Sequence, residues 1–282
     1  RAGGEDWLFG KLILACGSIA GEKNADFGGY ALAKALGHTI LKPLPALVQL
    51  RCAGSFWKGL AGGRCDARIQ LLISGRGTNE SYEEQGELQL TDYGISGIPV
   101  FQLSRFAAAA LDAGRQVKAS IDFLPGFRDN EALWQELVEE KCTSCRQRSM
   151  EVLFGGLVNK KIIQTAVKLC GLSMGDRAER KNLPAIRKVF ALLRSFEVQV
   201  TDTNPFANAQ VCAGGVPLTE VDGHLESRIC PGLYLAGELL DADGRCGGYN
   251  LQWAWTTGYI AGKDAVLSLG KPAGQRKKGK RE

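Results

Sequence analysis

Near the start of the chain, the pattern of apolar and polar residues predicts a strand followed by a helix. Residues 7–16 form a mostly apolar run that Gly17 ends, which predicts a buried strand followed by a turn. Residues 27–36 carry apolar side chains at helical spacing, and Gly37 follows at the position where helices commonly end. The pattern therefore predicts a strand–helix unit, from which the proline-containing residues 43–45 lead the chain away.

The spacing of apolar residues then changes from strand-like to helix-like along the middle of the chain. Short alternating runs separated by glycine-rich turns predict a β-rich piece over residues 50–90. The same criteria predict helices at residues 98–113, 131–140, 157–170, 184–196 and 250–269, and strands at 117–123, 197–201 and 233–236. Pro184 suits the first turn of its helix, because its missing N–H would have no helical partner there.

This order of elements predicts an α/β fold in which one domain is interrupted by a long excursion of the chain. We assign the first segment of that domain to residues 1–48 and its returning segment to residues 197–269. Between them we expect a β-rich subdomain over residues 49–125 and a helical subdomain over residues 126–196. Residues 270–282 are predicted to form a basic, disordered tail.

The distribution of charge narrows the classes of function. The 282 residues carry a formal net charge of +5, and the last twelve residues hold six basic groups against one acidic group. Residues 1–270 are therefore neutral overall, which argues against a nucleic-acid-binding surface. No run approaches the about 18 apolar residues of a membrane-spanning helix. The nine cysteines are too sparse for a disulfide scaffold, so we expect a cytoplasmic protein with reduced thiols and no membrane association.

Few side chains suit a metal site. Cys142 and Cys145 form a lone CxxC pair, whereas a structural zinc site needs a second pair at similar spacing. The two histidines are His38 and His224, so a histidine-rich metal site is excluded. We expect no bound metal, with redox use of the CxxC pair as the alternative. His38 follows Gly37 and is predicted to cap the preceding helix.

The most informative segment runs from residue 231 to residue 255. It reads as a short buried strand that ends in Glu238 and Asp241, then a glycine-rich turn, then a long helix. Carboxylates at the end of such a strand can accept hydrogen bonds from sugar hydroxyls, and a helix N-terminus attracts an electron-rich group. Alternatively, the glycines form only a tight loop, with Trp253 and Trp255 in the core.

This segment resembles the C-terminal flavin-binding signature of a bacterial FAD-dependent oxidoreductase family of the aminoacetone oxidase and 3-dehydro-bile-acid reductase type. Other blocks resemble that family in the same order, at residues 14–17, 28–38, 43–50, 86–97 and 212–216. The resemblance implies that the chain is part of a two-segment Rossmann-like FAD-binding domain. It also implies cofactor contact for Cys16, Gly17, Gly214, Gly215, Gly237, Glu238, Asp241, Gly247, Gly248, Tyr249, Asn250 and Leu251.

Particular roles follow from the resemblance. Glu238 and Asp241 would bind ribityl or ribose hydroxyls, although Asp241 could instead cap the following turn. Residues 247–251 would meet the pyrimidine edge of the flavin. Gly214 and Gly215 would bring backbone N–H groups to the flavin face, or would form an ordinary hairpin turn.

The sequence departs from the family pattern at two places. Ser18 and two further residues follow Gly17 where the family usually continues with Gly-Lys, so the flavin-side role of this loop depends on its fold. The family's GxGxxG motif, which holds the FAD pyrophosphate, does not occur in the 282 residues. We therefore expect the chain to correspond to the C-terminal two-thirds of such a protein and to bind FAD weakly or not at all.

From these residues and the resemblance we expect an FAD-dependent oxidoreductase that takes electrons from NAD(P)H. Its substrate would be a small hydrophobic molecule with a conjugated C=C bond, such as a bile-acid-like 3-oxo steroid. Tyr93 is the candidate proton donor to the substrate, with Arg105 as an alternative, and the other role open to Tyr93 is packing.

Two other functions remain open from the sequence. An aminoacetone-type amine oxidase would use the same cofactor and pass electrons to oxygen. A non-catalytic binding module would instead contact nucleic acid or anionic lipid through residues 271–282. The oligomeric state is not determined by the sequence.

Overall fold

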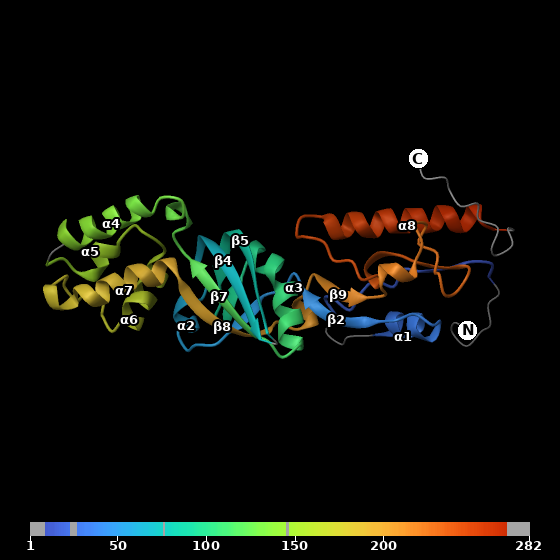
Figure 1. Cartoon of the computed structure of the whole chain (residues 1–282), viewed down its shortest axis with the longest axis horizontal. Coiled ribbons are helices and arrows are strands. Elements are labelled where there is room, and N and C mark those ends of the chain that lie inside the picture. The colour runs from blue at the N-terminus through green and yellow to red at the C-terminus, as the bar shows by residue number, and fades with distance from the viewer. Residues whose placement is uncertain (1–8, 23–26, 76, 145–146, 270–282) are drawn as a thin grey trace. The chain divides into compact units, whose positions relative to one another are not determined.

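The computed structural model describes residues 9–22, 27–75, 77–144 and 147–269. The chain divides into two compact units, which Figure 1 shows with their elements labelled. The two-segment unit combines residues 1–46 with residues 205–282, and the barrel unit comprises residues 47–204. Each unit has a hydrophobic core of its own.

Two small sheets form the centre of the two-segment unit. Strand β1 (Leu12–Leu14) pairs in parallel with β10 (Leu233–Leu235), and β2 (Leu41–Ala46) pairs antiparallel with β9 (Val211–Gly215). Each pair joins one strand from before the barrel unit to one strand from after it. The strand pairing therefore holds the two segments of this unit together.

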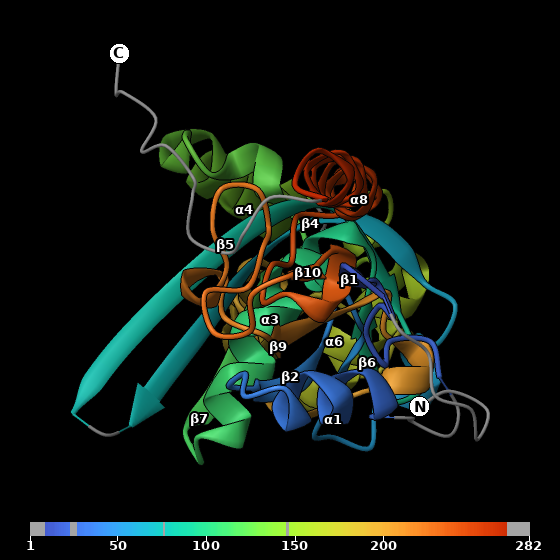
Figure 2. The same ribbon diagram turned by 90° about the vertical axis from the view of Figure 1, so that its right-hand side faces the viewer.

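Helix α8 (Tyr249–Leu267) packs on the β1–β10 pair, which lies beneath it in Figure 2. The Tyr234 hydroxyl donates to Asp264 Oδ2 over 2.8 Å and so ties the buried strand β10 to α8. The unit also contains α1 (Gly28–Ala35) and the short 3₁₀ helices η3 (Phe206–Asn208), η4 (Leu218–Glu220) and η5 (Gly237–Leu239).

The barrel unit contains a closed antiparallel barrel with the strand order β3-β6-β5-β4-β7-β8. The strands are β3 (Leu50–Cys52), β4 (Arg64–Gly75), β5 (Thr78–Leu90), β6 (Gly94–Ser96), β7 (Gln116–Asp122) and β8 (Phe196–Thr203). Alternate residues of β4, from Ala67 to Ile73, are buried, as the two-residue period of a strand requires. Helix α3 (Ile98–Asp112) packs on this barrel through its buried apolar side.

Further helices of the barrel unit share one continuous apolar core with the barrel. They are α2 (Trp57–Leu60), η1 (Pro125–Phe127), α4 (Glu131–Ser144), α5 (Met150–Phe154), α6 (Lys160–Leu169), η2 (Arg180–Asn182) and α7 (Leu183–Arg194). The apolar sides of α6 and α7 bury Ile163 and Phe190, and the polar sides leave charged residues such as Lys168 and Lys188 in solvent.

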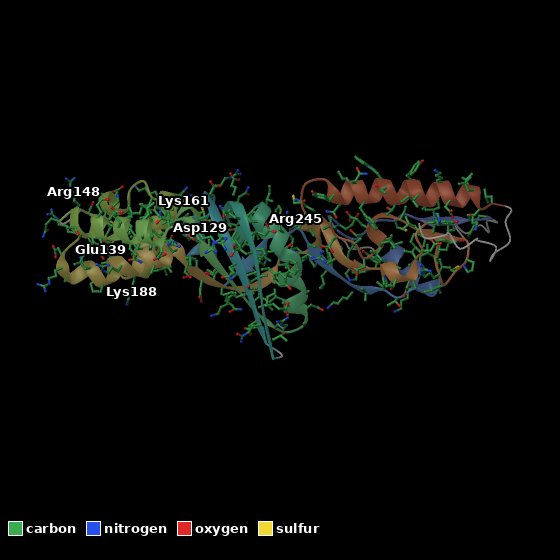
Figure 3. The ribbon with its side chains drawn as sticks, turned by 45° about the horizontal axis from the view of Figure 1, so that its top comes forward. Asp129, Glu139, Arg148, Lys161, Lys188 and Arg245 are labelled. Atoms are coloured by element: carbon green, nitrogen blue, oxygen red, sulfur yellow. The ribbon has the colours of Figure 1, made fainter. Side chains whose placement is uncertain are left out.

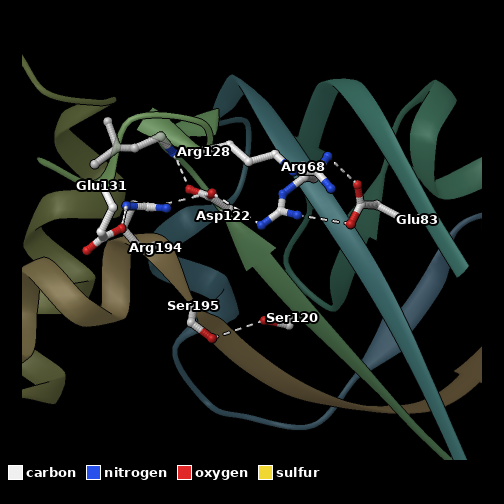
Figure 4. Close-up of polar contacts among 9 residues, drawn as sticks. Arg68, Glu83, Ser120, Asp122, Arg128, Glu131, Arg194 and Ser195 are labelled. Carbon is white, nitrogen blue, oxygen red and sulfur yellow. Dashed lines mark hydrogen bonds and ion pairs between the residues drawn. The ribbon is translucent and has the colours of Figure 1, made fainter. Parts of the chain in front are cut away.

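A buried carboxylate connects the barrel to these helices (Figure 4). Asp122, at the end of β7, is 3% exposed and lies between Arg68 Nη2 at 3.7 Å and Arg194 Nε at 3.5 Å. Arg68 then pairs with Glu83 on β5, and Arg194 pairs with Glu131 on α4. The chain of charges therefore joins three barrel strands, β4, β5 and β7, to the two helices α4 and α7.

Most predicted helices and strands are present with shifts of a few residues at their ends, and the mixed α/β class is confirmed. Strand β8 differs, because it pairs with β3 and β7 and closes the barrel, whereas the sequence placed residues 197–201 in the returning segment. Strands β2 and β9 were not predicted, because prolines in β2 and paired glycines in β9 weaken the usual strand signal.

The predicted capping role of His38 is wrong. Its imidazole is buried, with Nδ1 2.8 Å from Glu220 Oε2 and Nε2 2.9 Å from the Ser227 hydroxyl. The helix end is satisfied by the backbone instead, since His38 N–H donates to the Ala33 carbonyl. The tertiary structure therefore uses this histidine to join α1 to the returning segment.

The expectations about metal sites, disulfides and membrane helices can be compared with the described residues. Among the described residues no group of three or more potential metal ligands occurs, and no disulfide joins two described cysteines. No helix of the described part of the chain is long and apolar enough to cross a membrane. Cys145 of the CxxC pair and the basic tail at 270–282 lie outside the described residues.

Candidate functional site

The candidate site lies where the parallel strands β1 and β10 end. Their carboxyl ends lead into residues 15–20 and residues 236–241, which parallel pairing places side by side. The N–H of Ala236 donates to the carbonyl of Leu14, so the two loops leave the sheet together. In open α/β sheets this edge is where ligands bind.

A hydrogen bond joins the two loops through their side chains. The Ser18 hydroxyl donates to Glu238 Oε2 over 2.7 Å and accepts the N–H of Ala20 at 3.2 Å. Gly17, at φ +74°, has no heavy atom within 4 Å of the place where a Cβ would lie, so there is open space beside this pair. The hydrogen bond orients the carboxylate of Glu238, which is partly buried.

The Tyr30 hydroxyl is the most unusual group of this region. The residue is 4% exposed, and its oxygen is buried without a hydrogen-bond partner. Burial raises the pKa of Tyr30 above its ordinary value, and the nearby Cys212 and Glu238 raise it further. A buried polar group without a partner costs free energy, so a hydroxyl in this position points to a ligand or a water molecule.

Gly214 and Gly215 of β9 lie so close to neighbouring backbone that a side chain would not fit at either position. A Cβ on Gly214 would lie 2.5 Å from the Lys42 carbonyl oxygen, and one on Gly215 would lie 2.6 Å from the Leu239 carbonyl oxygen. The N–H of Gly214 donates to Asp241 Oδ1 over 3.0 Å. Gly214 and Gly215 therefore end a strand and do not form a hairpin turn. One predicted donor, the Gly214 N–H, is used inside the protein by Asp241.

The turn before α8 is held by its own side chains. Asn250 accepts the N–H of Gly244 at 2.7 Å and donates to its carbonyl at 3.0 Å. Gly237 is held in the same way, because its N–H donates to Thr257 and its carbonyl accepts from Trp253. The polar groups of Asn250 and Gly237 therefore make hydrogen bonds within the protein and hold the backbone around the site in place.

The remaining residues that were predicted to contact the cofactor lie at the start of α8 and are exposed. Gly247, Gly248, Tyr249 and Leu251 all reach solvent, and Tyr249 and Leu251 are 65% and 60% exposed. Gly248 is the N-cap residue of α8, and no side chain caps the first N–H groups of the helix, so these donors can face a ligand. Trp255 is also exposed, so the alternative that placed it in the core is wrong.

Tyr93 belongs to the barrel unit, whereas the residues described above belong to the two-segment unit. Its hydroxyl accepts from Asn204 Nδ2 over 2.8 Å, and the Arg51 guanidinium lies 5.0 Å from its ring centroid. Arg51 Nε donates in turn to Asn204 Oδ1 at 3.0 Å. Tyr93 also lines a hollow of about 380 Å³ between the α2–β4 and β5–β6 turns. Because its oxygen accepts from Asn204, its proton is free to point elsewhere.

Ser18, Tyr30 and Asn204 are the functional candidates that the sequence did not identify. Ser18 was visible as a departure from the family pattern, yet 220 positions separate it from Glu238. Tyr30 reads as an ordinary apolar position of a helix. Their roles depend on contacts between distant segments, which periodicity does not report. Cys16 lies exposed beside Gly29, where a Cβ would come within 2.8 Å of Cys16 Cβ.

A two-segment α/β unit with a carboxylate after its parallel strands and a long helix that starts at glycines has the features of a Rossmann-like domain. The chain belongs to the HI0933-like family, since the profile of the HI0933-like protein Rossmann domain matches residues 2–264. The predicted family resemblance is confirmed.

Three curated proteins are similar to this chain. The 3-dehydro-bile acid delta(4,6)-reductase of Clostridium scindens is 40% identical over 268 residues, 94% of this chain and 64% of that protein. The ribosomal RNA dihydrouridine synthase of Haemophilus influenzae is 28% identical over 90% of this chain and 59% of its own length. The protein of the same name from Escherichia coli is 26% identical over 92% and 61%. The chain thus spans 59–64% of the length of these relatives.

Proposed function

We propose that the protein is a cytoplasmic FAD-dependent oxidoreductase that reduces a carbon–carbon double bond with electrons from NAD(P)H. The observation that carries the proposal is the buried Tyr30 hydroxyl, which has no hydrogen-bond partner and belongs to the helix that packs through Gly29 against Cys16, in the loop after β1. The family membership and the 40% identity to a reductase support the same conclusion.

The residues at this edge fit the polar half of a flavin. Glu238 can accept hydrogen bonds from ribityl or ribose hydroxyls, and Ser18 holds it in the required orientation. Tyr30 offers an O–H donor that has no internal use. The uncapped N–H groups at the start of α8 suit the electron-rich pyrimidine edge, with Gly247 and Gly248 allowing close approach. Asp241 contributes by positioning β9 through Gly214.

When bound, FAD would supply two-electron transfer between a reduced nicotinamide and the substrate. The residues of the chain bind and orient the reactants. We assign Tyr93 the role of proton donor to the substrate, because Asn204 donates to its oxygen and leaves its own proton available. Arg51 over the ring would stabilise the negative charge that develops on the phenol.

The names of the relatives describe one kind of chemistry on two kinds of molecule. A delta(4,6)-reductase and a dihydrouridine synthase both add hydrogen across a carbon–carbon double bond. In a 3-oxo steroid and in uridine this bond is conjugated to a carbonyl group, which makes it able to accept hydride. We therefore propose reduction of a conjugated C=C bond, and a hydrophobic bile-acid-like molecule or a uridine of RNA as its substrate.

The test begins with the natural gene product purified without added flavin. It should be yellow, its absorbance near 450 nm should bleach with NADH or NADPH in the absence of oxygen, and a 3-oxo-Δ4,6 steroid or a uridine-containing RNA should restore the colour. A colourless protein that ignores FAD would refute the proposal. Hydrogen peroxide formed from aminoacetone without nicotinamide would identify an amine oxidase instead.

A further inference from the structure

Asn204 is a buried amide of the barrel unit whose polar side-chain atoms are all hydrogen-bonded. It is 4% exposed and directly follows strand β8. Its Oδ1 accepts from Arg51 Nε at 3.0 Å. Its Nδ2 donates to Gln49 Oε1 at 3.2 Å and to the Tyr93 hydroxyl oxygen at 2.8 Å. One amide group therefore holds two side chains at the start of β3 and one from the turn before β6.

Hydrogen-bond chemistry fixes the direction of every bond in this network. A guanidinium group only donates, so the Asn204 atom that meets Arg51 is the carbonyl oxygen. The amide nitrogen of Asn204 then points to Gln49 and Tyr93, and both must present an oxygen to it. The Gln49 Nε2 group and the proton of Tyr93 are consequently not used by Asn204.

The donors that remain on these three side chains have no acceptor among the described residues. Arg51 keeps both Nη groups and is exposed, Tyr93 keeps its O–H, and Gln49 keeps its Nε2 group. Asp202 lies opposite Arg51 in the strand register, but its Oδ1 accepts the N–H of Thr203 and it forms no ion pair with Arg51. We name Gln49, Arg51 and Tyr93 the donor cluster, because they offer N–H and O–H groups to a ligand.

Donors gathered around one positive charge suit an oxygen atom that gains negative charge. The guanidinium carbon of Arg51 lies 5.0 Å from the centroid of the Tyr93 ring, so the charge is next to the phenol. In a conjugated ketone, addition of hydride to the double-bond carbon farther from the carbonyl moves an electron pair onto the carbonyl oxygen. A proton from Tyr93 converts the resulting enolate to the enol, which rearranges to the saturated ketone, and the phenolate recovers its proton from water.

We propose that the donor cluster binds the carbonyl oxygen of the substrate and stabilises the enolate that forms during reduction. The inference rests on the proposed function for the reaction. It adds Gln49 and Arg51 as substrate-binding residues and Asn204 as the positioning residue that directs the Tyr93 proton. Because the cluster acts on the oxygen, the enzyme should reduce a double bond conjugated to a carbonyl group and leave an isolated double bond unchanged.

The first test uses the full chain without flavin and 4-nitrophenol, whose yellow anion carries a conjugated oxygen as an enolate does. The donor cluster should favour the bound anion over the neutral phenol about tenfold, because hydrogen bonds to a charged group are the strong ones. A titration of the probe's absorbance against pH measures this preference. Arg51→Met should abolish it and Tyr93→Phe should reduce it, whereas an unchanged titration of the probe with the parent chain would refute the inference.

Two matched controls remove an exposed arginine elsewhere in the barrel unit. Arg148→Met changes a residue that Figure 3 shows on the helical part of this unit. Arg64→Met changes a residue of the hollow that Tyr93 also lines. Both variants should keep the parent's preference for the anion. Equal loss in Arg148→Met would reduce the effect to net charge, and loss in Arg64→Met would place the probe in the hollow, so either result would overturn the donor cluster.

The second test addresses the positioning role of Asn204 in the natural gene product with bound flavin. Asn204→Leu should slow transfer to a conjugated ketone about tenfold or more and leave reduction by the nicotinamide at the parent rate. Equal slowing of both steps would indicate a structural role only. Circular dichroism at increasing temperature verifies folding, and if Asn204→Leu does not fold, Arg51→Met and Tyr93→Phe still test the cluster.

The two tests separate this inference from the proposed function. A yellow reductase whose chain does not favour the nitrophenol anion would refute the donor cluster and leave the proposed function intact. A colourless gene product that favours the anion through Arg51 would refute the proposed function instead, because the first test requires no flavin.

Discussion

The hydroxyl of Ser18 donates to the carboxylate of Glu238 over 2.7 Å and so joins the loop after β1 to the loop after β10. Both loops leave the carboxyl ends of parallel strands, the edge at which Rossmann-like domains bind nucleotides. The bond fixes one carboxylate oxygen and leaves Glu238 able to accept further hydrogen bonds. The residue at which the sequence departs from the family pattern therefore positions the acid that the resemblance assigns to the cofactor.

We expect Glu238→Gln to weaken flavin binding about tenfold or more, because a hydrogen bond to a charged group contributes about 1.5–3 kcal/mol. Flavin affinity is measured by ultrafiltration of the purified protein with added FAD. Glu22→Gln, an exposed residue shortly after the same loop, is the matched control and should leave affinity unchanged. Unchanged affinity in both variants would remove Glu238 from the cofactor site.

Tyr30→Phe should have opposite effects on stability and on binding. Without ligand, removal of a buried hydroxyl that has no partner should leave the free energy of unfolding unchanged or raise it. With flavin, loss of the donor should weaken affinity several-fold. Urea denaturation with and without FAD measures both effects, and Tyr259→Phe, at an exposed tyrosine of α8, is the control. A loss of stability without ligand would show that Tyr30 has an internal partner.

Asp122→Ala should destabilise the barrel unit by about 3 kcal/mol, since it leaves Arg68 and Arg194 without their buried counter-charge. The matched change Glu131→Ala, at a side chain that is 63% exposed, should cost about 0.5 kcal/mol. Urea denaturation compares the two. Equal costs would mean that the pairing at Asp122 contributes little beyond that of a surface ion pair.

The contact between His38 and Glu220 predicts a pH dependence of stability. Burial alone would raise the pKa of Glu220, but hydrogen bonds from Thr39 and the contact with His38 outweigh burial and lower it. A carboxyl group with a lowered pKa stabilises the fold above its ordinary pKa, and this contribution is lost as the pH falls through the folded value. Glu220→Gln should therefore be less stable than the parent near pH 7 and approach it near pH 3. A constant difference in urea midpoints between these pH values would contradict the assignment.

Tyr93→Phe should separate the two halves of the proposed reaction. Reduction by NAD(P)H should proceed at the parent rate, whereas transfer to the substrate should slow about 100-fold or more if the phenol supplies the proton. Stopped-flow absorbance of the flavin measures each half separately. An equal rate of transfer in Tyr93→Phe would leave Tyr93 as a structural partner of Asn204.

Local periodicity was sufficient for the elements with strong apolar patterns. The helices α3, α7 and α8 and the strands β7 and β10 lie within a few residues of their predicted ranges. The strand pair β2–β9 was missed, since prolines and glycines weaken the strand signal. The prolines are tolerated because β2 pairs with β9 alone, and the glycines of β9 allow a close approach of neighbouring backbone. The return of β8 to the barrel was missed for a related reason, since pairing partners lie far away in sequence.

The sequence by itself determined the family, the α/β class and the segments that carry the candidate site, because those properties depend on short motifs and local spacing. Only the tertiary structure decided how the polar groups are used. It assigned Asp241 to Gly214, Asn250 to Gly244 and His38 to Glu220, and it left the Tyr30 hydroxyl without a partner. A hydrogen bond requires two groups within about 3 Å, and chain folding alone brings distant residues so close.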